Sequence, residues 1–159
     1  MKKAYLLLYH GIWFGAVLCS LPLRPFCGKS RWFRRLFPRL PQDPIPGKTV
    51  WVHALSVGEV ISAIPLIRAL RERCPRREIV LTVTTRQGLE IARRELGGEL
   101  RALLPMPLDF LGAVRRLAHH LNPAIFILVE TDLWPGLLFH LRDAGVGTLL
   151  VNGRISPRT

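Results

Sequence analysis

Five short apolar runs, separated by segments of helical periodicity, constrain the fold of this chain more than any other feature of its sequence. The expected strands are Val50–Ala54, Ile79–Thr84, Ala102–Leu104, Ala124–Val129 and Thr148–Val151. The apolar spacing between them predicts helices over Val57–Arg73, Gln87–Leu96, Asp109–Leu121 and Trp134–Ala144. This alternation predicts an α/β domain of Rossmann-like type, in which helices cover both faces of a parallel sheet.

The N-terminal part has a different character. Residues 4–23 contain no charged side chain apart from one histidine, and twenty helical residues extend about 30 Å, the thickness of a bilayer's hydrocarbon core. Between Arg24 and Arg39 there are six basic residues and no acidic one, a bias typical of cytoplasmic flanks. We expect a membrane-anchor helix at residues 1–23, a basic juxtamembrane segment and linker at 24–47, and a cytoplasmic globular domain at 48–159.

An alternative for the apolar segment is a helix that lies in the membrane interface, with Trp13, Tyr5 and Tyr9 at the headgroups. The net charge of +12 has much of its excess beside this segment, which favours an anionic membrane surface as partner over nucleic acid. The cysteines and histidines lack metal-ligand spacing, so no metal is expected. Since nucleotide-binding glycine motifs are also absent, we expect no cofactor.

The stretch "HALSVGEV", residues 53–60, follows the first expected strand, and ligands of such sheets collect at the carboxyl ends of the strands. Ser56 and Glu59 have the spacing of a capping box, in which each stabilises the start of the helix. Gly58 costs about 1 kcal/mol in a helix relative to alanine, and it suits a place where another molecule approaches the backbone. Glu59 is therefore a candidate proton acceptor as well as a cap.

Glu130 directly follows the fourth expected strand, in "VETDLWPG". It is either a strand-end carboxylate that hydrogen-bonds to nearby backbone or a functional group, because burial of an unpartnered carboxylate is costly. The loops "TTRQG", residues 84–88, and "NGRIS", residues 152–156, also follow strands. Their polar groups either make turns or bind a sugar or phosphate.

Four stretches carry a combination of motifs: "WVHALSVGEVISAIPLIRAL", "TVTTRQG", "LVETDLWPGLL" and "LVNGRISPRT". In this order and spacing they resemble the N-terminal domain of the bacterial Kdo transferases, over residues 48–159. That family transfers 3-deoxy-D-manno-octulosonic acid (Kdo) from CMP-Kdo to a lipid A precursor in lipopolysaccharide synthesis. The resemblance implies the N-terminal acceptor half of a GT-B glycosyltransferase fold, located on the cytoplasmic face of the inner membrane.

The resemblance also implies roles for individual residues. Glu59 matches the family's general base, which deprotonates the acceptor hydroxyl in an inverting displacement. Glu130 matches a glutamate that supports the transition state or holds the acceptor. The residues that the resemblance places in substrate binding are Ser56, Gly58, Thr85 and Arg154.

The sequence departs from the family pattern at two levels. Arg86 and Gln87 stand where proline and threonine are usual, and Asp132 stands for glutamate. The second domain, which carries most of the CMP-Kdo site in the family, is not in this sequence. We therefore expect an acceptor half that is inactive without a donor domain; the alternative is a non-catalytic, membrane-associated lipid-binding fragment.

Overall fold

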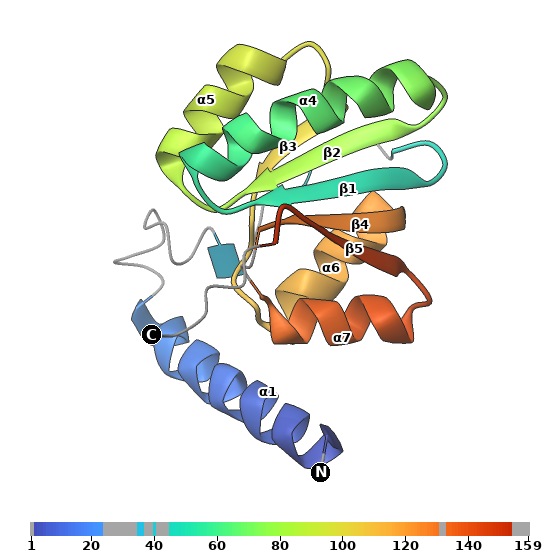
Figure 1. Ribbon diagram of the computed structural model, residues 1–159. Helices are drawn as coiled ribbons and strands as arrows, with labels where there is room; N and C mark the ends of the chain where they lie inside the picture. The colour runs from blue at the N-terminus through green and yellow to red at the C-terminus, as the bar shows by residue number, and fades with distance from the viewer. Residues whose placement is uncertain (1, 24–34, 37–39, 41–44, 131–132, 154–159) are drawn as a thin grey trace, which may run out of the picture.

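The computed structural model, which describes residues 2–23, 35, 36, 40, 45–130 and 133–153, contains a single five-stranded sheet (Figure 1). The strands are β1 (Thr49–Ala54), β2 (Glu78–Val83), β3 (Ala102–Pro105), β4 (Pro123–Val129) and β5 (Gly147–Val151). Their spatial order is β3-β2-β1-β4-β5, and every neighbouring pair is parallel. The predicted Rossmann-like parallel sheet is confirmed.

Two helices cover each face of the sheet (Figure 1). On one face lie α4 (Val57–Arg73) and α5 (Arg86–Leu96), and on the other lie α6 (Leu111–Leu121) and α7 (Pro135–Asp143). The predicted elements agree with these bounds to within two residues at each end. The chain builds β1, β2 and β3 in one direction and then returns through α6 to place β4 on the other side of β1. The carboxyl ends of β1 and β4 therefore flank the point at which the strand order reverses.

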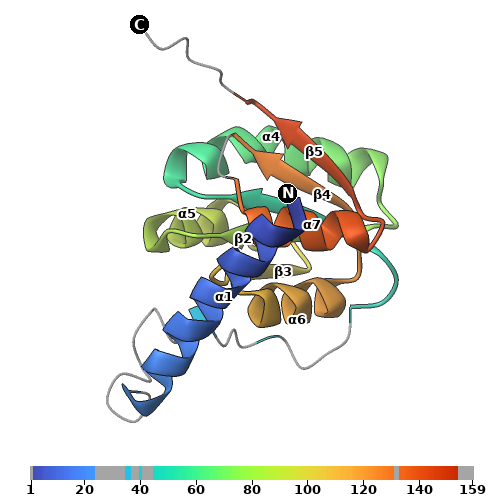
Figure 2. The ribbon, with the colours of Figure 1, turned by 90° about the horizontal axis from the view of Figure 1, so that it is seen from below.

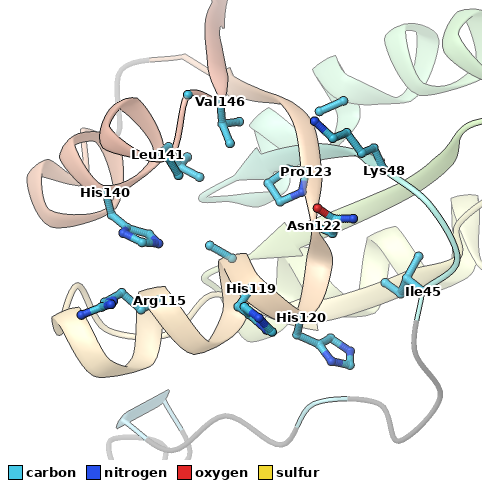
Figure 3. A pocket seen from close by; sticks show the side chains of 14 residues that line it. Ile45, Lys48, Arg115, His119, His120, Asn122, Pro123, His140, Leu141 and Val146 are labelled. Carbon is cyan, nitrogen blue, oxygen red and sulfur yellow. The ribbon is translucent and has the colours of Figure 1, made fainter.

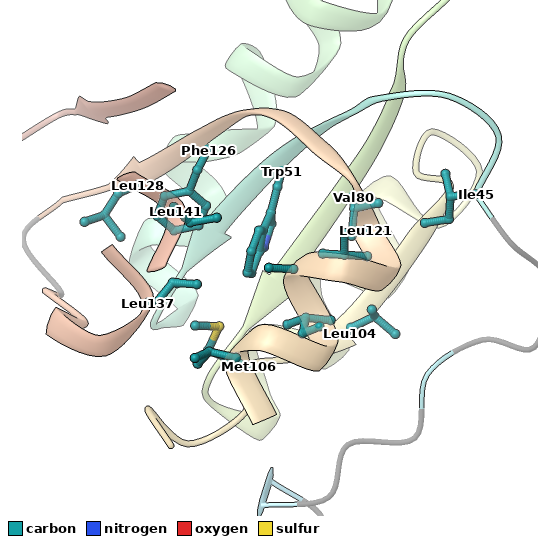
Figure 4. Packing of buried hydrophobic residues seen from close by; sticks show 13 residues of the cluster. Ile45, Trp51, Val80, Leu104, Met106, Leu121, Phe126, Leu128, Leu137 and Leu141 are labelled. Atoms are coloured by element: carbon teal, nitrogen blue, oxygen red, sulfur yellow. The ribbon is translucent and has the colours of Figure 1, made fainter. Parts of the chain in front are cut away.

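The core consists of two apolar layers, one on each side of the sheet. In the central strand β1 all six residues are buried, which explains its nearly uninterrupted apolar run. Val50 and Val52 belong to the layer under α4 and α5, whereas Trp51 belongs to the layer under α6 and α7. In that second layer the ring of Trp51 meets Phe126 edge-on, with ring centroids 4.9 Å apart (Figure 4).

A small polar network lies within this core. The indole Nε1 of Trp51 donates to Thr82 Oγ1 at 2.8 Å, and the Thr82 hydroxyl lies 3.4 Å from the carbonyl oxygen of Val52, to which it donates. The fully buried His53 has its Nδ1 3.1 Å from the Thr82 carbonyl oxygen, a contact that requires the hydrogen to be on Nδ1. These bonds compensate the loss of hydration that burial of the polar groups entails.

The N-terminal helix α1 (Lys2–Ser20) ends in a 3₁₀ turn, η1 (Leu21–Leu23). No helix in the described part of the chain is long and apolar enough to cross a membrane, so the structure does not support the predicted membrane-anchor helix at residues 1–23. The helix α1 begins with two lysines and ends at Ser20. The apolar part between them is therefore shorter than the residue range 4–23 on which the expectation of a span was based.

One side of α1 packs against the globular part instead. Figure 1 and Figure 2 both place α1 on the side of the sheet that α6 and α7 cover. Trp13 and the buried Val17 join a cluster with Leu36 and Leu108. The Tyr9 hydroxyl donates to a carboxylate oxygen of Asp109 at 2.7 Å. Tyr9 and Trp13 are thus used in protein contacts, whereas the alternative of a helix that lies in the membrane interface stays a prediction.

Described residues of the expected linker also contact the domain. Leu36 is 2% exposed, and Ile45 is buried in the core layer under α6. The Arg35 Nε donates to the carbonyl of Met106 at 2.9 Å. This part of the chain is therefore held against the loop that follows β3.

Asp109 fixes the start of α7 from a distant part of the chain. Trp134, the N-cap residue of α7, makes no side-chain cap, and the carboxylate of Asp109 accepts from the backbone N–H groups of Gly136 and Leu137 at 2.7 and 2.8 Å. Asp109 is only 2% exposed. A Cβ atom at Gly136 would lie 2.8 Å from Asp109 Oδ1, so only glycine leaves room for this contact.

Pro65 lies inside α4, where it removes one backbone hydrogen bond. It is on the exposed side of the helix, one turn after the exposed Ile61. The carbonyl that loses its partner is therefore next to solvent, which explains why the helix tolerates the proline.

β5 is an edge strand that pairs only with β4 among the described residues. Its neighbouring leucines point to opposite faces, and both are well exposed, Leu149 at 46% and Leu150 at 47%. The described elements thus leave this edge less covered than the rest of the sheet.

We expect Asp109→Ala to lower the free energy of unfolding by about 2 kcal/mol, because it leaves buried N–H donors of α7 without an acceptor. Urea denaturation followed by circular dichroism measures this change. The matched control is Asp143→Ala, which removes an exposed carboxylate at the other end of α7 and is expected to change stability by less than about 0.5 kcal/mol. Equal effects of the two substitutions would contradict the role given to Asp109.

Candidate functional site

The candidate site lies along the carboxyl edge of the sheet, where the loops after the strands are tied together in pairs. Thr85 N donates to the carbonyl of Leu55 at 3.0 Å, which joins the loop after β2 to the loop after β1. Glu130 N donates to the carbonyl of Val151 at 2.9 Å, which joins the end of β4 to that of β5. The structure thus brings Ser56 and Thr85 together on one side of the reversal point, and Glu130 and Asn152 on the other.

The predicted capping box at the start of α4 is present, with one difference. Ser56 is the N-cap, and its Oγ accepts from the Glu59 N–H at 3.5 Å. The carboxylate of Glu59 accepts from the backbone N–H of Leu55, one residue before the position expected of a capping box. Its other oxygen lies 3.4 Å from Ser56 Oγ. The side chain is therefore folded back over the end of β1.

Glu59 is nearly buried, with only 6% of its surface exposed. Hydrogen bonds from Leu55 and Ser56, together with the positive end of the α4 dipole, stabilise an ionised carboxylate at this place. In chemical terms the arrangement is suited to accepting a proton from a hydroxyl group brought to the edge of the sheet.

Two glycines near this site serve different purposes. Gly58 is exposed, and a Cβ atom added there would meet only Ser56 Oγ, at 3.9 Å, so the backbone is open to approach from outside. Gly88 is buried, and a Cβ atom there would lie 2.7 Å from a methyl carbon of Val83. Its N–H donates to Thr85 Oγ1 at 3.1 Å, so the Thr85 hydroxyl caps α5.

Glu130 has an unusual backbone conformation at the end of β4. Its φ angle is +62°, in the left-handed region that non-glycine residues occupy at a cost of about 1 kcal/mol. The side chain is half-buried, and its Oε1 accepts from Asn152 Nδ2 at 3.4 Å. Of the two alternatives left open by the sequence, one was a hydrogen bond to nearby backbone; the partner that the structure shows is this side chain after β5. Arg154 and Asp132 lie outside the described residues.

Three residues that sequence reasoning did not assign to the site, His53, Trp134 and Arg35, pack together in the structure. The buried ring of His53 meets Trp134 edge-on at 5.9 Å, and the guanidinium of Arg35 lies 5.7 Å from the centroid of the same Trp134 ring. Sequence reasoning missed His53 because it lies within an apolar strand, and it missed Arg35 because this residue was grouped with the basic residues expected to face the membrane. The strand alternation that turns Trp51 toward α6 and α7 also predicts this inward direction for His53.

Among the described side chains, no three histidine, cysteine or carboxylate groups lie together as metal ligands do. A cavity of about 800 Å³ lies at the opposite, amino-terminal edge of the sheet, beside α6 and α7 (Figure 3). It includes none of the residues predicted for catalysis.

Comparison with known proteins supports the resemblance seen in the motifs. The model of the family described as 3-deoxy-D-manno-octulosonic-acid transferase (kdotransferase) matches residues 30–159. The chain is 35% identical over 109 residues to the 3-deoxy-D-manno-octulosonic acid transferase of Haemophilus influenzae, covering 68% of this chain and 25% of that protein. It is 40% identical over 111 residues to the enzyme of the same name from Bordetella pertussis, covering 66% and 25%.

A crystal structure of UDP-N-acetylglucosamine 2-epimerase is similar in fold, with a TM-score of 0.50 and 16% sequence identity over 71% of this chain and 34% of that one. At this identity the likeness concerns the fold alone. The chain spans about a quarter of the length of the two transferases that it matches. From the matched family model and these relatives, we conclude that the chain belongs to the 3-deoxy-D-manno-octulosonic acid (Kdo) transferase family.

Proposed function

We propose that this chain is the acceptor-binding part of an inverting glycosyltransferase that moves Kdo from CMP-Kdo to a lipid A precursor, with Glu59 as the general base. The observation that carries the proposal is the buried carboxylate of Glu59 at the carboxyl end of the central strand, beside the open backbone of Gly58. This place, next to the reversal of strand order, is where open α/β sheets bind ligands.

In the proposed reaction, the hydroxyl oxygen of the acceptor attacks the anomeric carbon of Kdo from the side opposite the nucleotide. The bond to the phosphate oxygen of CMP breaks as the new bond forms, and CMP leaves with the electron pair. Glu59 accepts the hydroxyl proton, for which its oxygen must come within about 3 Å of the acceptor. We further propose that residues beyond this chain hold most of CMP-Kdo.

The remaining predicted site residues are assigned to the acceptor side. Ser56 and Gly58 shape the loop around the base, and Glu130 supports the transition state or holds the acceptor. Support for Glu130 comes from its strained backbone conformation, since such strain clusters at functional sites. Thr85 and Arg154 remain proposed substrate-binding residues; the Thr85 hydroxyl would have to combine this role with its cap on α5.

We also propose that the protein works at the cytoplasmic face of the inner membrane, resting on the surface. The side of α1 that faces away from the domain carries exposed apolar residues, among them Leu8, Ile12 and Phe14. A helix of this kind, followed by basic residues, suits an interface with anionic lipid. This face also favours a second candidate function, that of a non-catalytic lipid-binding fragment.

In a longer protein that carries this sequence and transfers Kdo, we expect Glu59→Gln to lower kcat at least about 100-fold, the usual contribution of a general base. Glutamine keeps a carbonyl oxygen for the Leu55 N–H, so the start of α4 is expected to remain folded. Transfer of radiolabelled Kdo and the circular dichroism spectrum measure the two effects. Glu90→Gln, at an exposed ion pair of α5, is the control and is expected to leave kcat unchanged. Near-normal transfer by the Glu59 variant would refute its role.

For the 159-residue chain, calorimetry in detergent is expected to detect binding of a lipid A precursor and none of CMP-Kdo. Glu59→Ala is expected to weaken acceptor binding, because it removes the carboxylate proposed to receive the hydroxyl. Donor binding by this chain would overturn the division of substrates proposed here. Unchanged acceptor binding by the variant would instead favour the lipid-binding fragment.

Sedimentation with vesicles of phosphatidylglycerol tests the membrane surface. We expect Ile12→Ser to reduce the bound fraction, since it places a hydroxyl on the exposed face of α1. Ile61→Ser is the matched control, because Ile61 is an isoleucine of similar exposure, 55% against 66%, on α4. A similar loss of binding in both variants would argue against α1 as the contacting surface.

A further inference from the structure

The cavity at the amino-terminal edge of the sheet is unrelated to the proposed catalytic site and has a distinctive lining. It is about 800 Å³ in volume and is formed by α6, α7 and the chain that leads into β1 and β4 (Figure 3). The basic or titratable side chains that line it are Lys48, Arg115, His119, His120 and His140. Among its described lining residues, none is acidic.

The two permanent charges of this group have no acidic partner in the part of the chain that the structure describes. Neither Lys48 nor Arg115 forms an ion pair with a described residue. The carboxylate of α7, that of Asp143, is exposed and lies 2.6 Å from the Nη2 nitrogen of Arg142, outside the lining of the cavity. A concave surface with several cations and no acid focuses a positive potential.

The preference of helix ends for basic residues explains only some of the basic side chains that line the cavity. His119, His120 and His140 lie in last turns of helices, where the dipole favours basic residues. Arg115 lies in the middle of α6, and Lys48 precedes β1, so no helix terminus explains either of them. In addition, the Nε2 atom of His120 is buried and has no hydrogen-bond partner among the described residues.

The positive charge near the cavity also affects the pKa of His140. Partial burial lowers the pKa of His140 below its ordinary value of 6.5, and the nearby positive charge of Arg115 lowers it further. Asp143 acts in the opposite direction without reversing the shift. A negative charge inside the cavity would raise the pKa of His140, so the titration of this side chain can be used to detect anion binding.

We propose that this cavity binds a phosphate group, with Arg115 as the charged donor and His119 and His140, which lie at the same end of the cavity in Figure 3, as further donors. Arginine suits this ligand because its guanidinium donates two parallel hydrogen bonds to phosphate oxygens. The phosphate belongs either to a small soluble anion or to a lipid headgroup. The proposal is independent of the transferase activity, since the site lies at the opposite edge of the sheet from Glu59.

The first experiment titrates the 159-residue chain with inorganic phosphate and follows the ring signals of its histidines by NMR. Phosphate is expected to shift the His140 signals and to raise the pKa of His140. Arg115→Gln is expected to weaken binding about tenfold, the usual effect of losing one charged hydrogen-bond partner. Arg116→Gln is the matched control, because it removes an exposed arginine that is next in sequence but does not line the cavity.

A parallel titration with phosphatidylglycerol vesicles identifies the source of the phosphate. A response to inorganic phosphate that Arg115→Gln weakens and Arg116→Gln does not supports a site for a small anion. The same pattern with vesicles alone supports a lipid headgroup. The proposal is overturned if neither probe shifts His140, or if both variants weaken binding equally, which would indicate diffuse attraction to a basic protein. Both arginines are exposed, so loss of folding is not expected to obscure the result.

Discussion

The complete burial of β1 is the constraint on which the rest of the structure depends. A strand that is hydrogen-bonded on both sides and covered on both faces has no freedom of register, because a shift by one residue would exchange the apolar layers. The position of its carboxyl end is fixed in the same way. Ser56 and Glu59 therefore emerge from the most rigid part of the sheet, which is where a group that must meet a substrate in a defined geometry is best held.

Polar contacts between distant parts of the chain complete this edge. Asp109, in the loop after β3, caps α7 and also accepts a hydrogen bond from the hydroxyl of Tyr9 in α1. The ring of His53 in β1 packs edge-on against Trp134, the residue before α7. Both contacts join parts of the chain that are far apart in sequence.

Much of this fold could be predicted from the sequence because the relevant signals are local. The strand-length apolar runs predicted five strands, and Ser56 and Glu59 predicted the start of α4. Asp109 could not be predicted as the cap of α7, since it lies 27 residues before its first partner, Gly136. For Glu130, the sequence left the partner of the carboxylate open, and the structure supplied Asn152 from a neighbouring strand.

The N-terminal helix shows a different limit of sequence reasoning. Apolar composition alone does not distinguish a side chain that meets lipid from one that meets protein. In α1 the residues Tyr9, Trp13 and Val17, spaced four apart, face the domain, while Leu8 and Ile12 face away from it. Arg35 was grouped with the basic residues around it, although its contacts are with Met106 and Trp134. Tertiary contacts of this kind leave no periodic trace in so short a segment.

The exposed edge at β5 has a practical consequence for work with the 159-residue chain. An edge strand with unpaired backbone groups is a template for a strand from another molecule, and apolar side chains on both of its faces strengthen such an association. Leu149 and Leu150 supply those side chains. In concentrated solution this edge favours association between copies of the chain, and polar substitutions there are a natural first step toward a preparation that stays dispersed.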